Sequence, residues 1–415
     1  MPIRPQLVYA ILALVCLTLP SFAEVLLEDT SAYRNLKGSY EQTGELAHVY
    51  RLARLSYQGG RYQLALQWLT ILESRQWQMG IDRRAFDNVA PDRDINTLIN
   101  LLQERVPNPD EKSTPVLTLQ DPEVIPESIA YSSNNQTLYV GSLYKRKLVA
   151  RTLGKTPGPD RDLPPLPHDA YGAIYGIKYD HENNRLWVLH NELNDGQLEG
   201  RLTVVDPQGK LIKHFETATE TPAELNDLCL TESLVFVTDS QNHRVFKGSK
   251  SGSTLRVHVD DGLLRYPNGI ACHRGSDEIL VADYSGIVQI DAGPLAKANR
   301  LTLPSAYSLA GVDGLYLWQD RLVGIQNALG TPKIVIASLP DRVRITDVEF
   351  RDAFLPAFRI PTTGFILNDC LYYIANTSLD ALRPDGSLDA DAAQPEQATV
   401  HGLDLTESGR TCSLK

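Results

Sequence analysis

Four oxygen-bearing side chains occur at corresponding positions in similar stretches of the chain: Glu127, Asn226, Asn268 and Asp313. Each stands at the start of a short apolar run, in sequences such as "PNGIA" and "VDGLY". Carboxylate and amide oxygens are the hard ligands that Ca²⁺ takes in proteins, and two carboxylates balance the charge of one divalent cation. Histidine and cysteine are missing from the set, which argues against zinc or copper. These residue types predict a calcium site if the fold brings them together.

The four residues belong to a repeat of six segments, each of which reads as two apolar strands joined by a polar turn. The corresponding polar positions are Glu127, Tyr175, Asn226, Asn268, Asp313 and Thr363, which follow one another at intervals of 42 to 51 residues. A period of about 40 to 50 residues with about four strands per unit is typical of β-propeller blades. The sequence therefore predicts a mainly β fold, a six-bladed β-propeller. A β-sandwich with coincidental similarity between its strands is the alternative.

Propeller geometry gives the corresponding positions a common place. The first strand of each blade lines the central channel, so residues at its entrance converge on the axis. We therefore expect the four oxygen-bearing residues to meet there as metal ligands. Without a cation, two carboxylates that face each other repel, and one of them holds its proton more readily. Tyr175 and Thr363 fill the same positions in the second and sixth blades, where they would contact a substrate or simply pack.

Two carboxylates near this set are candidate general bases, Asp313 and Asp227. A divalent cation with open positions polarises a lactone carbonyl and stabilises the developing oxyanion, while a neighbouring carboxylate activates water. Asp227 directly follows Asn226, but adjacent residues of a regular strand point to opposite faces. Asp227 is therefore either such a base or a carboxylate satisfied within a turn.

The segments resemble the SMP-30/gluconolactonase/LRE-like family of six-bladed propellers over roughly residues 115–405. The motifs "PESIAY", "LNDLCL", "YPNGIA" and "GVDGLY" fall where that family has its metal-binding Glu, Asn, Asn and Asp. The resemblance implies that Glu127, Asn268 and Asp313 ligate the metal directly, and that Asn226 ligates it or holds a substrate or water. Most known members are metal-dependent hydrolases of lactones and esters. The more distant paraoxonases hold a histidine pair over the metal, and nothing in this sequence places His168 or His190 there.

The first residues have the pattern of a secretory signal peptide. Arg4 precedes an apolar stretch over residues 7–19, and the small residues at positions 21 and 23 fit a cleavage site. Residues 1–23 are therefore predicted to be a signal peptide, with an uncleaved anchor as the alternative. The mature protein would be periplasmic or secreted. No later segment has 18 consecutive apolar residues, so no membrane span is expected after cleavage.

Residues 24–107 are predicted to be helical, because Leu46, Val49 and Leu52 recur at helical spacing and a second such run follows Gly59-Gly60. This stretch resembles one tetratricopeptide (TPR) repeat, which would dock a protein partner or serve as an ordinary helical cap. Residues 108–115 read as a proline-containing linker, and residues 116–415 as the propeller with a C-terminal tail. Either "PVLTLQ" at 115–120 or "TVHGLDL" near the end would complete the last blade.

Export implies an oxidising compartment, in which the four cysteines after the signal peptide can form disulfides. Cys229 and Cys272 lie in apolar runs and are expected to be buried thiols. Cys370 and Cys412 are candidates for a disulfide that holds the C-terminal tail. Four cysteines allow three complete pairings, and their spacing does not choose among them.

The 415-residue chain has a formal net charge of -11 and no basic run beyond "YKRK" at 144–147, which argues against a nucleic-acid surface. The leading hypothesis is an exported, calcium-dependent hydrolase of the lactonase or esterase type, acting on a small-molecule lactone or ester. The alternative is a non-enzymatic propeller with a structural calcium and a partner-binding helical region. A quinone-dependent sugar dehydrogenase is a third candidate, although no clear basic and aromatic constellation for that cofactor is present.

Overall fold

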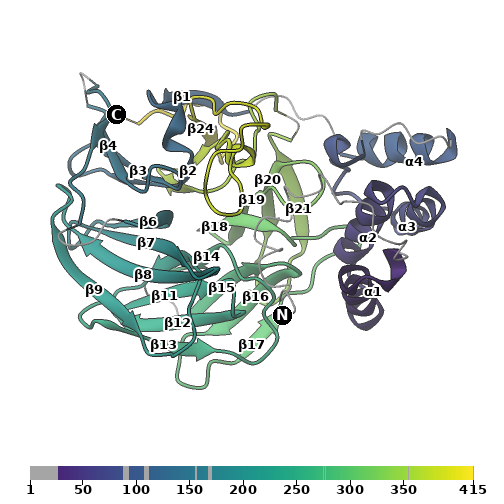
Figure 1. Cartoon of the computed structure of the whole chain (residues 1–415), viewed down its shortest axis with the longest axis horizontal. Helices are drawn as coiled ribbons and strands as arrows, with labels where there is room; N and C mark the ends of the chain where they lie inside the picture. The colour runs from purple at the N-terminus through teal and green to yellow at the C-terminus, as the bar shows by residue number, and fades with distance from the viewer. Residues whose placement is uncertain are drawn as a thin grey trace.

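The fold is mainly β, with a small group of helices at one side of a propeller-like arrangement of sheets (Figure 1). It is seen in a computed structural model that describes residues 27–86, 93–106, 112–154, 157–166, 171–273, 275, 277–353 and 355–414. The expected signal peptide over residues 1–23 and residues 108–111 of the expected linker lie outside the described residues.

The described strands form six antiparallel units of four strands each. The first unit contains β2 (Pro126–Ser132), β3 (Thr137–Ser142), β4 (Leu148–Thr152) and β5 (Arg161–Asp162). The second contains β6 (Ala173–Asp180), β7 (Arg185–Asn194), β8 (Gln197–Val205) and β9 (Leu211–Thr217). The third contains β10 (Leu225–Leu230), β11 (Leu234–Asp239), β12 (Arg244–Ser249) and β13 (Thr254–Val259). A short parallel pairing of β9 with β13 joins the second and third units into one sheet of eight strands.

The remaining three units follow the same plan. The fourth contains β14 (Ile270–Cys272), β15 (Glu278–Asp283), β16 (Gly286–Asp291) and β17 (Ala298–Arg300). The fifth contains β18 (Val312–Trp318), β19 (Arg321–Gln326), β20 (Lys333–Ser338) and β21 (Asp347–Arg351). The sixth contains β22 (Gly364–Leu367), β23 (Cys370–Ile374), β24 (Thr399–Asp404) and, from the other end of the chain, β1 (Thr114–Thr118).

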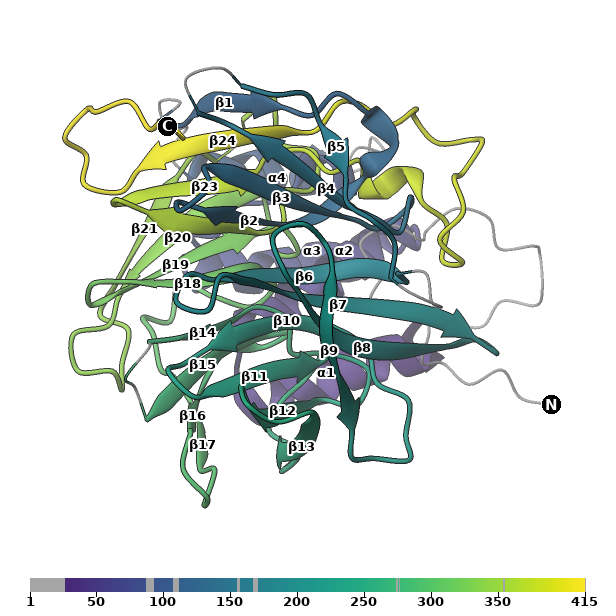
Figure 2. The ribbon, with the colours of Figure 1, turned by 90° about the vertical axis from the view of Figure 1, so that its left-hand side faces the viewer.

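Both strands that the sequence offered for the last unit take part in it. β24 pairs with β23, and β1 pairs with the outer edge of β24, with Thr114 opposite Gly402. The ring is therefore closed by strands from the two ends of the propeller sequence, as Figure 2 shows along its upper edge. This pairing ties the segment that precedes the first unit to the sixth unit.

The innermost strands contact one another in ring order: β2, β6, β10, β14, β18, β22 and again β2. Glycine makes the close approach possible at several of these contacts. A Cβ atom placed on Gly269 would lie 2.0 Å from the carbonyl oxygen of Asp313, and one on Gly314 would lie 2.9 Å from that of Thr362. The turn-like pairs Asn268-Gly269 and Asp313-Gly314 are therefore points where neighbouring units touch, rather than turns.

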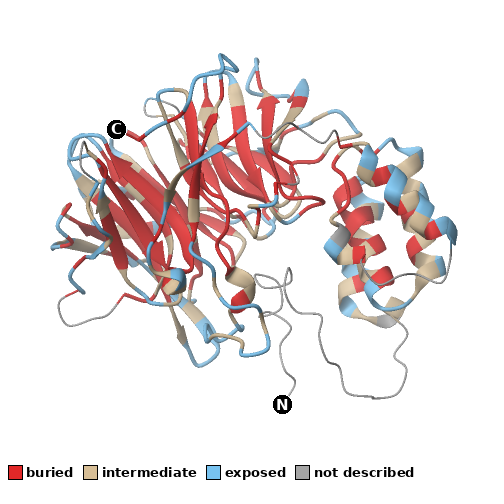
Figure 3. Ribbon diagram, turned by 90° about the horizontal axis from the view of Figure 1, so that it is seen from above, coloured by how far each residue is buried: buried red, intermediate tan, exposed pale blue. Residues whose placement is uncertain are grey.

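Apolar side chains fill the space between adjacent units. One cluster joins Phe236 and Val245 of the third unit to Ile279 and Val288 of the fourth, all fully buried. Similar clusters occur between the other units, and Figure 3 shows buried residues along most strands. The central strands are therefore buried on both faces, which is why they read as continuous apolar runs rather than as strict alternation.

The helical region consists of α1 (Ser31–Thr43), α2 (Leu46–Gln58), α3 (Tyr62–Ser74) and α4 (Arg93–Glu104). Thr30 caps α1 by accepting a hydrogen bond from the Tyr33 N–H, and Gly44 ends it in the left-handed conformation. The predicted hairpin is α2 and α3, joined at Gly59-Gly60. Among the described residues, no helix combines the length and apolar character needed to cross a bilayer.

One face of α2 packs on the propeller. The Arg51 Nη1 donates a 2.7 Å hydrogen bond to the carbonyl of Tyr284, and its guanidinium lies 3.3 Å from the centre of the Tyr284 ring. Lys333 of β20 is completely buried, and its Nζ donates to three carbonyl oxygens, those of Met79 (3.0 Å), Leu329 (3.2 Å) and Thr331 (2.7 Å). One face of α2 is thus occupied by contacts within the chain itself.

The cysteines form two disulfides, and one of them corrects an expectation. Cys370 pairs with Cys412 and fastens the C-terminal tail to β23, as predicted. Cys229 and Cys272 are also paired, so the prediction of two buried thiols was wrong. The two cysteines meet because β10 and β14 are neighbours in the ring of innermost strands. This contact brings their Cα atoms to 5.9 Å from each other, although the residues lie 43 positions apart in the sequence.

Candidate functional site

The predicted axis residues sit at irregularities of the innermost strands. The pairing of β2 with β3 slips between Pro126 and Ser128, around Glu127, and the pairing of β6 with β7 slips around Tyr175. The same shift occurs in β10 between Leu225 and Leu228, and in β18 between Val312 and Leu315. Each is a β-bulge, in which two residues of one strand oppose a single residue of its partner and the side chains are re-aimed.

The fourth unit has an equivalent arrangement at Asn268. The Asn268 N–H donates to the carbonyl of Ala282, while the Ala282 N–H donates to the carbonyl of Gly269, both at 2.8 Å. Ala282 therefore faces two residues of the inner strand. The repeat that the sequence revealed is thus a repeated bulge, and it gives five of the six units an inner-strand residue with a redirected side chain.

Three of the four predicted ligands carry a buried oxygen that has no hydrogen-bond partner among the described residues: Glu127 Oε2, Asn268 Oδ1 and Asp313 Oδ1. Glu127 is 8% exposed and Asp313 is 5% exposed. Buried polar atoms are ordinarily paired, because leaving one unpaired costs about 1–3 kcal/mol. Unpaired buried oxygens on the first, fourth and fifth units are what a set of cation ligands would present.

Burial and the charges of other carboxylates raise the pKa values of Glu127 and Asp313. Burial raises the pKa of Glu127 well above its usual value, and the nearby charges of Asp313 and Asp227 raise it further. Burial also raises the pKa of Asp313 to about 7. The hydrogen bond from the Asn327 amide opposes this rise, the charge of Asp227 adds to it, and the Asn268 amide opposes it. Repulsion between carboxylates without a cation is the behaviour expected of the predicted site.

Asp227 reaches this group, contrary to the expectation that it would face away from Asn226. The bulge in β10 removes strict alternation at these two residues. The Asp227 Oδ1 accepts from the Leu228 N–H at 2.8 Å and lies 3.0 Å from the Nζ of Lys178, while its Oδ2 accepts from the Ile270 N–H at 3.2 Å. Both oxygens are thus engaged, and Asp227 ties the second, third and fourth units together.

The three predicted substrate contacts belong to the second, third and sixth units: Tyr175 lies on β6, Asn226 on β10, and Thr363 directly before β22. Thr363 is buried, and its hydroxyl donates at 2.8 Å to the main-chain carbonyl of Glu127, so it joins the sixth unit to the first. Burial raises the pKa of the Tyr175 phenol, and the charges of Glu224 and Glu127 raise it further. Asn226 is half-buried in the β10 bulge.

Further residues complete the site and were not predicted. The Asn327 Nδ2 donates to Asp313 Oδ2 at 2.6 Å and to the Pro361 carbonyl at 2.9 Å. The Tyr316 hydroxyl accepts from the Gly364 N–H, and the Nζ of Lys178 lies 5.5 Å from its ring centre. Glu224 is 4% exposed, and its Oε1 has no partner among the described residues. Asn327, Tyr316 and Lys178 lie within the repeated segments but not at the corresponding polar position, and Glu224 lies just before one of these segments.

Among the described residues, no histidine is found in contact with the carboxyl and amide groups of the candidate site. His190 is buried, with Nδ1 accepting from the Gly172 N–H at 3.1 Å and Nε2 3.0 Å from the Thr203 hydroxyl. These contacts agree with the structural role expected for it. His168 lies outside the described residues.

The helical region lies on the same side of the propeller as the site. Ala282, which pairs with Asn268, is two residues before the Tyr284 that Arg51 contacts. Leu329, which accepts from Lys333, is two residues after Asn327, the partner of Asp313. Figure 2 views the propeller from the opposite side, with the helices behind it. The helices therefore lie beside the channel mouth at the fourth and fifth units, where they would restrict access.

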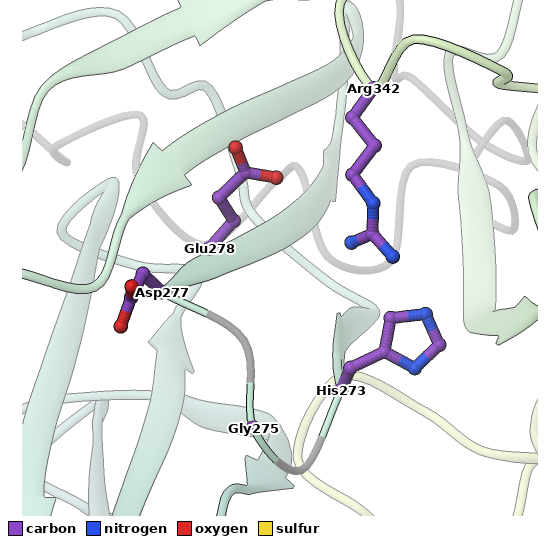
Figure 4. A pocket seen from close by; sticks show the side chains of 5 residues that line it. All are labelled: His273, Gly275, Asp277, Glu278 and Arg342. Carbon is purple, nitrogen blue, oxygen red and sulfur yellow. The ribbon is translucent and has the colours of Figure 1, made fainter.

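A surface pocket lies away from these residues. It has a volume of about 530 Å³ and is lined by His273, Gly275, Asp277, Glu278 and Arg342. Figure 4 shows the His273 and Arg342 side chains facing the same open space. His273 follows the end of β14, whereas Asn268 precedes its start, so this pocket is at the opposite end of the strand and contains none of the predicted residues.

No protein-family model matches the chain, and no curated protein matches its sequence. Among solved structures, the major allergen Mala s 1 of Malassezia sympodialis is similar over 71% of this chain and 96% of its own, with a TM-score of 0.52 and 13% identity. A Thermus thermophilus protein described as a putative oxidoreductase (glucose dehydrogenase) matches at TM-score 0.47 and 10% identity, over 71% of this chain and 100% of its own. Virginiamycin B lyase of Staphylococcus aureus matches at a TM-score of 0.44 and 14% identity, over 66% of this chain and 79% of its own.

The likeness to Mala s 1 supports the propeller fold and nothing more specific, and the other two are too distant to carry an argument. Function must therefore be argued from the site. Among the described residues, no group of three or more His, Cys, Asp or Glu side chains has the arrangement of a metal site. The predicted set differs from such a group because amide oxygens make up half of it. The unpaired buried oxygens of Glu127, Asn268 and Asp313 fit a hard divalent cation such as Ca²⁺.

Proposed function

We propose that this protein is an exported, calcium-dependent hydrolase of lactones or esters, of the kind found in the SMP-30/gluconolactonase family. The observation that carries the proposal is the set of unpaired buried oxygens on Glu127, Asn268 and Asp313 at equivalent bulges of the first, fourth and fifth units. A carboxyl pair held close without a cation is costly, and a divalent cation removes that cost.

Each residue has a role in this proposal. Glu127, Asn268 and Asp313 would hold the cation, and Asn226 would ligate it or orient the substrate. When bound, the cation would supply Lewis-acid polarisation of the substrate carbonyl. Asp313 would accept a proton from the attacking water, because Asn327 fixes its Oδ2 and leaves its Oδ1 unpaired. We prefer Asp313 to Asp227 as the base, since both oxygens of Asp227 already have partners.

Two further features support parts of the proposal. Two disulfides among the described residues favour an oxidising compartment, which agrees with a periplasmic or secreted protein. The docking of α2 on the propeller leaves less support for the alternative, a non-enzymatic propeller whose helical region captures a partner.

The test is calcium binding by the mature protein. Protein stripped with EDTA is titrated calorimetrically with CaCl₂, beside Asp313→Asn, Asn268→Ala and a control, Asp277→Asn, which alters a carboxylate at the opposite end of the fourth unit. We expect one site in the wild-type protein and in the control, and at least a tenfold loss of affinity in the two site variants. Turnover of lactones and esters should then require calcium. Absence of calcium binding by the wild-type protein would exclude this function.

A further inference from the structure

A separate cavity lies among the innermost strands, farther along the channel than the candidate site. Its volume is about 130 Å³, and its lining comes mainly from β2, β6 and β22. Because β6 and β22 both contact β2 in the ring, a cavity that touches all three lies on the channel side of β2. Glu127 and Tyr175 stand near the starts of β2 and β6, whereas the lining residues of these strands come later. The cavity therefore lies toward the opposite end of the channel.

Lys178 and Tyr316 reach across the channel beside this cavity. They belong to β6 and β18, which stand opposite each other in the ring of innermost strands. The Lys178 Nζ lies 5.5 Å from the centre of the Tyr316 ring, and the Tyr316 hydroxyl accepts a hydrogen bond from the Gly364 N–H. Lys178 and Gly364 also line the cavity, whereas His181, another lining residue, is exposed. We therefore expect a ligand to enter from the end away from the predicted metal ligands.

The lining is mainly apolar, and its lysine is already paired. Ile129, Ile177 and Ile366 contribute aliphatic side chains from three different units. The Lys178 Nζ lies 3.0 Å from Asp227 Oδ1, so its charge is balanced within the protein. A charged ligand would lose its hydration here without meeting an unbalanced lysine, which is costly. The cavity therefore favours a neutral, apolar molecule.

One wall of the cavity is aromatic. The rings of Tyr131 and Phe365, which both line it, are stacked with their centres 5.7 Å apart and their planes at 8°. Phe365 is half-buried, so its side chain is only partly covered by the protein. Aromatic side chains add offset-stacked or edge-to-face contacts to the burial of apolar area when another ring lies against them. A ligand that carries a ring would therefore gain more from this wall than an alkyl chain.

We propose that this cavity is a binding site for a small neutral molecule with one aromatic ring. The size agrees, because an apolar cavity of about 150 Å³ accommodates a molecule of benzene. The ring would lie among the three isoleucines and against Tyr131 and Phe365. This site requires neither a cation nor the carboxyl groups of Glu127 and Asp313, so it stands or falls independently of the proposed hydrolase.

The probe is benzyl alcohol, a neutral molecule with one ring, and its binding to the mature protein is measured by saturation-transfer NMR titration. We expect one saturable site in the wild-type protein. Benzoate and benzylammonium, which keep the ring but carry a charge at pH 7, should bind at least tenfold more weakly. Addition of EDTA and the substitution Asp313→Asn should leave benzyl alcohol binding unchanged, since both act on the candidate metal site instead.

Substitutions that fill the cavity test its position. Ile366→Trp and Leu367→Trp each place a larger side chain at a half-buried lining residue, and each should weaken benzyl alcohol binding at least tenfold. Using both positions protects the test if one variant fails to fold. The matched control is Leu295→Trp, which adds the same side chain at a residue that is 80% exposed between β16 and β17 and should bind the probe as the wild-type protein does.

Three outcomes would overturn the inference. They are the absence of saturable benzyl alcohol binding, equal binding of the charged analogues, and binding that both tryptophan variants retain. Loss of binding in EDTA or in Asp313→Asn would also reject it, because the probe would then occupy the candidate metal site. Benzyl alcohol binding that the two tryptophan variants lose, in a protein that does not bind calcium, would uphold the cavity as a binding site and reject the proposed hydrolase.

Discussion

The side-chain amide of Asn327 donates a 2.6 Å hydrogen bond to Oδ2 of Asp313, and Oδ1 of Asp313 has no partner among the described residues. The amide also donates to the Pro361 carbonyl, so it is held by the segment that leads into the sixth unit. One oxygen of Asp313 is therefore fixed in orientation while the other is presented to the channel. If Asp313 holds a cation as proposed, Asn327 would orient it for that role.

Replacing Asn327 with leucine, which is similar in size, should weaken calcium binding without removing any ligand. Loss of an orienting hydrogen bond of this kind costs about 10- to 100-fold in metal affinity. Calorimetric titration of Asn327→Leu measures the loss, with Asn135→Leu, at an exposed turn of the first unit, as the control. An affinity equal to that of the wild-type protein would mean that Asp313 does not need Asn327 to hold its position.

The metal-free protein should lose stability as the pH rises through the range in which Asp313 titrates. The pKa of Asp313 is about 7 in the folded state and about 4 in the unfolded chain. Between those values the folded state binds more protons, so the free energy of unfolding falls with rising pH, by an amount on the order of a few kcal/mol. Thermal unfolding in EDTA at pH 5 and pH 8 measures this. Saturating calcium should reverse the trend, and Asp313→Asn should flatten it.

Gly269→Ala should both destabilise the protein and weaken the metal site. The added Cβ would lie 2.0 Å from the Asp313 carbonyl oxygen and 2.8 Å from the Leu315 nitrogen, so the fourth and fifth units must separate. Overpacking of this kind costs about 1–3 kcal/mol. The matched control is Gly275→Ala, in the same unit, where nothing lies within 4 Å of the added atom. Equal melting temperatures for the two variants would contradict the tight contact.

Arg51→Ala should loosen the helical region from the propeller. The substitution removes the hydrogen bond to the Tyr284 carbonyl and the stacking on its ring, together worth about 1–3 kcal/mol. Limited proteolysis between the helices and the propeller should become faster, while Arg75→Ala, at an exposed position after α3, should behave as the wild-type protein. Unchanged proteolysis would assign the docking to Lys333 and its carbonyl contacts instead.

Removing the Cys370–Cys412 disulfide should lower the free energy of unfolding by about 4 kcal/mol, because the bond closes a chain segment with a sequence separation of 42 residues. The double variant Cys370→Ser, Cys412→Ser avoids a leftover free thiol. Denaturant unfolding measures the change. A much smaller value would mean that packing alone holds the tail against β23.

The period of the repeat was sufficient to predict the propeller and the inner position of its polar residues, since one residue per unit recurred in the same register. The reach of Asp227 was not predictable, because it depends on a bulge that replaces simple alternation. Asn327 follows the second strand of its unit, and Lys178 reaches Asp227 from a neighbouring unit. The Cys229–Cys272 pair likewise required the ring contact between β10 and β14. These contacts between units form only in the assembled ring. Comparing the repeated segments with one another therefore could not predict them.

The pairing of β1 with β24 sets a condition on how the chain acquires its structure. Thr114 leaves the ribosome well before its partner Gly402, which lies near the other end of the chain. Until β24 has been synthesised, β1 has no strand to pair with, and the five earlier units form an open arc. Contacts so distant in sequence are slow to form, because a long loop must close before any pairing repays it. Ring closure should therefore be the last and slowest event of folding. In a chain that stops before residue 399, β1 and the outer edge of β23 should stay unpaired, exposed to proteases and to pairing with other chains.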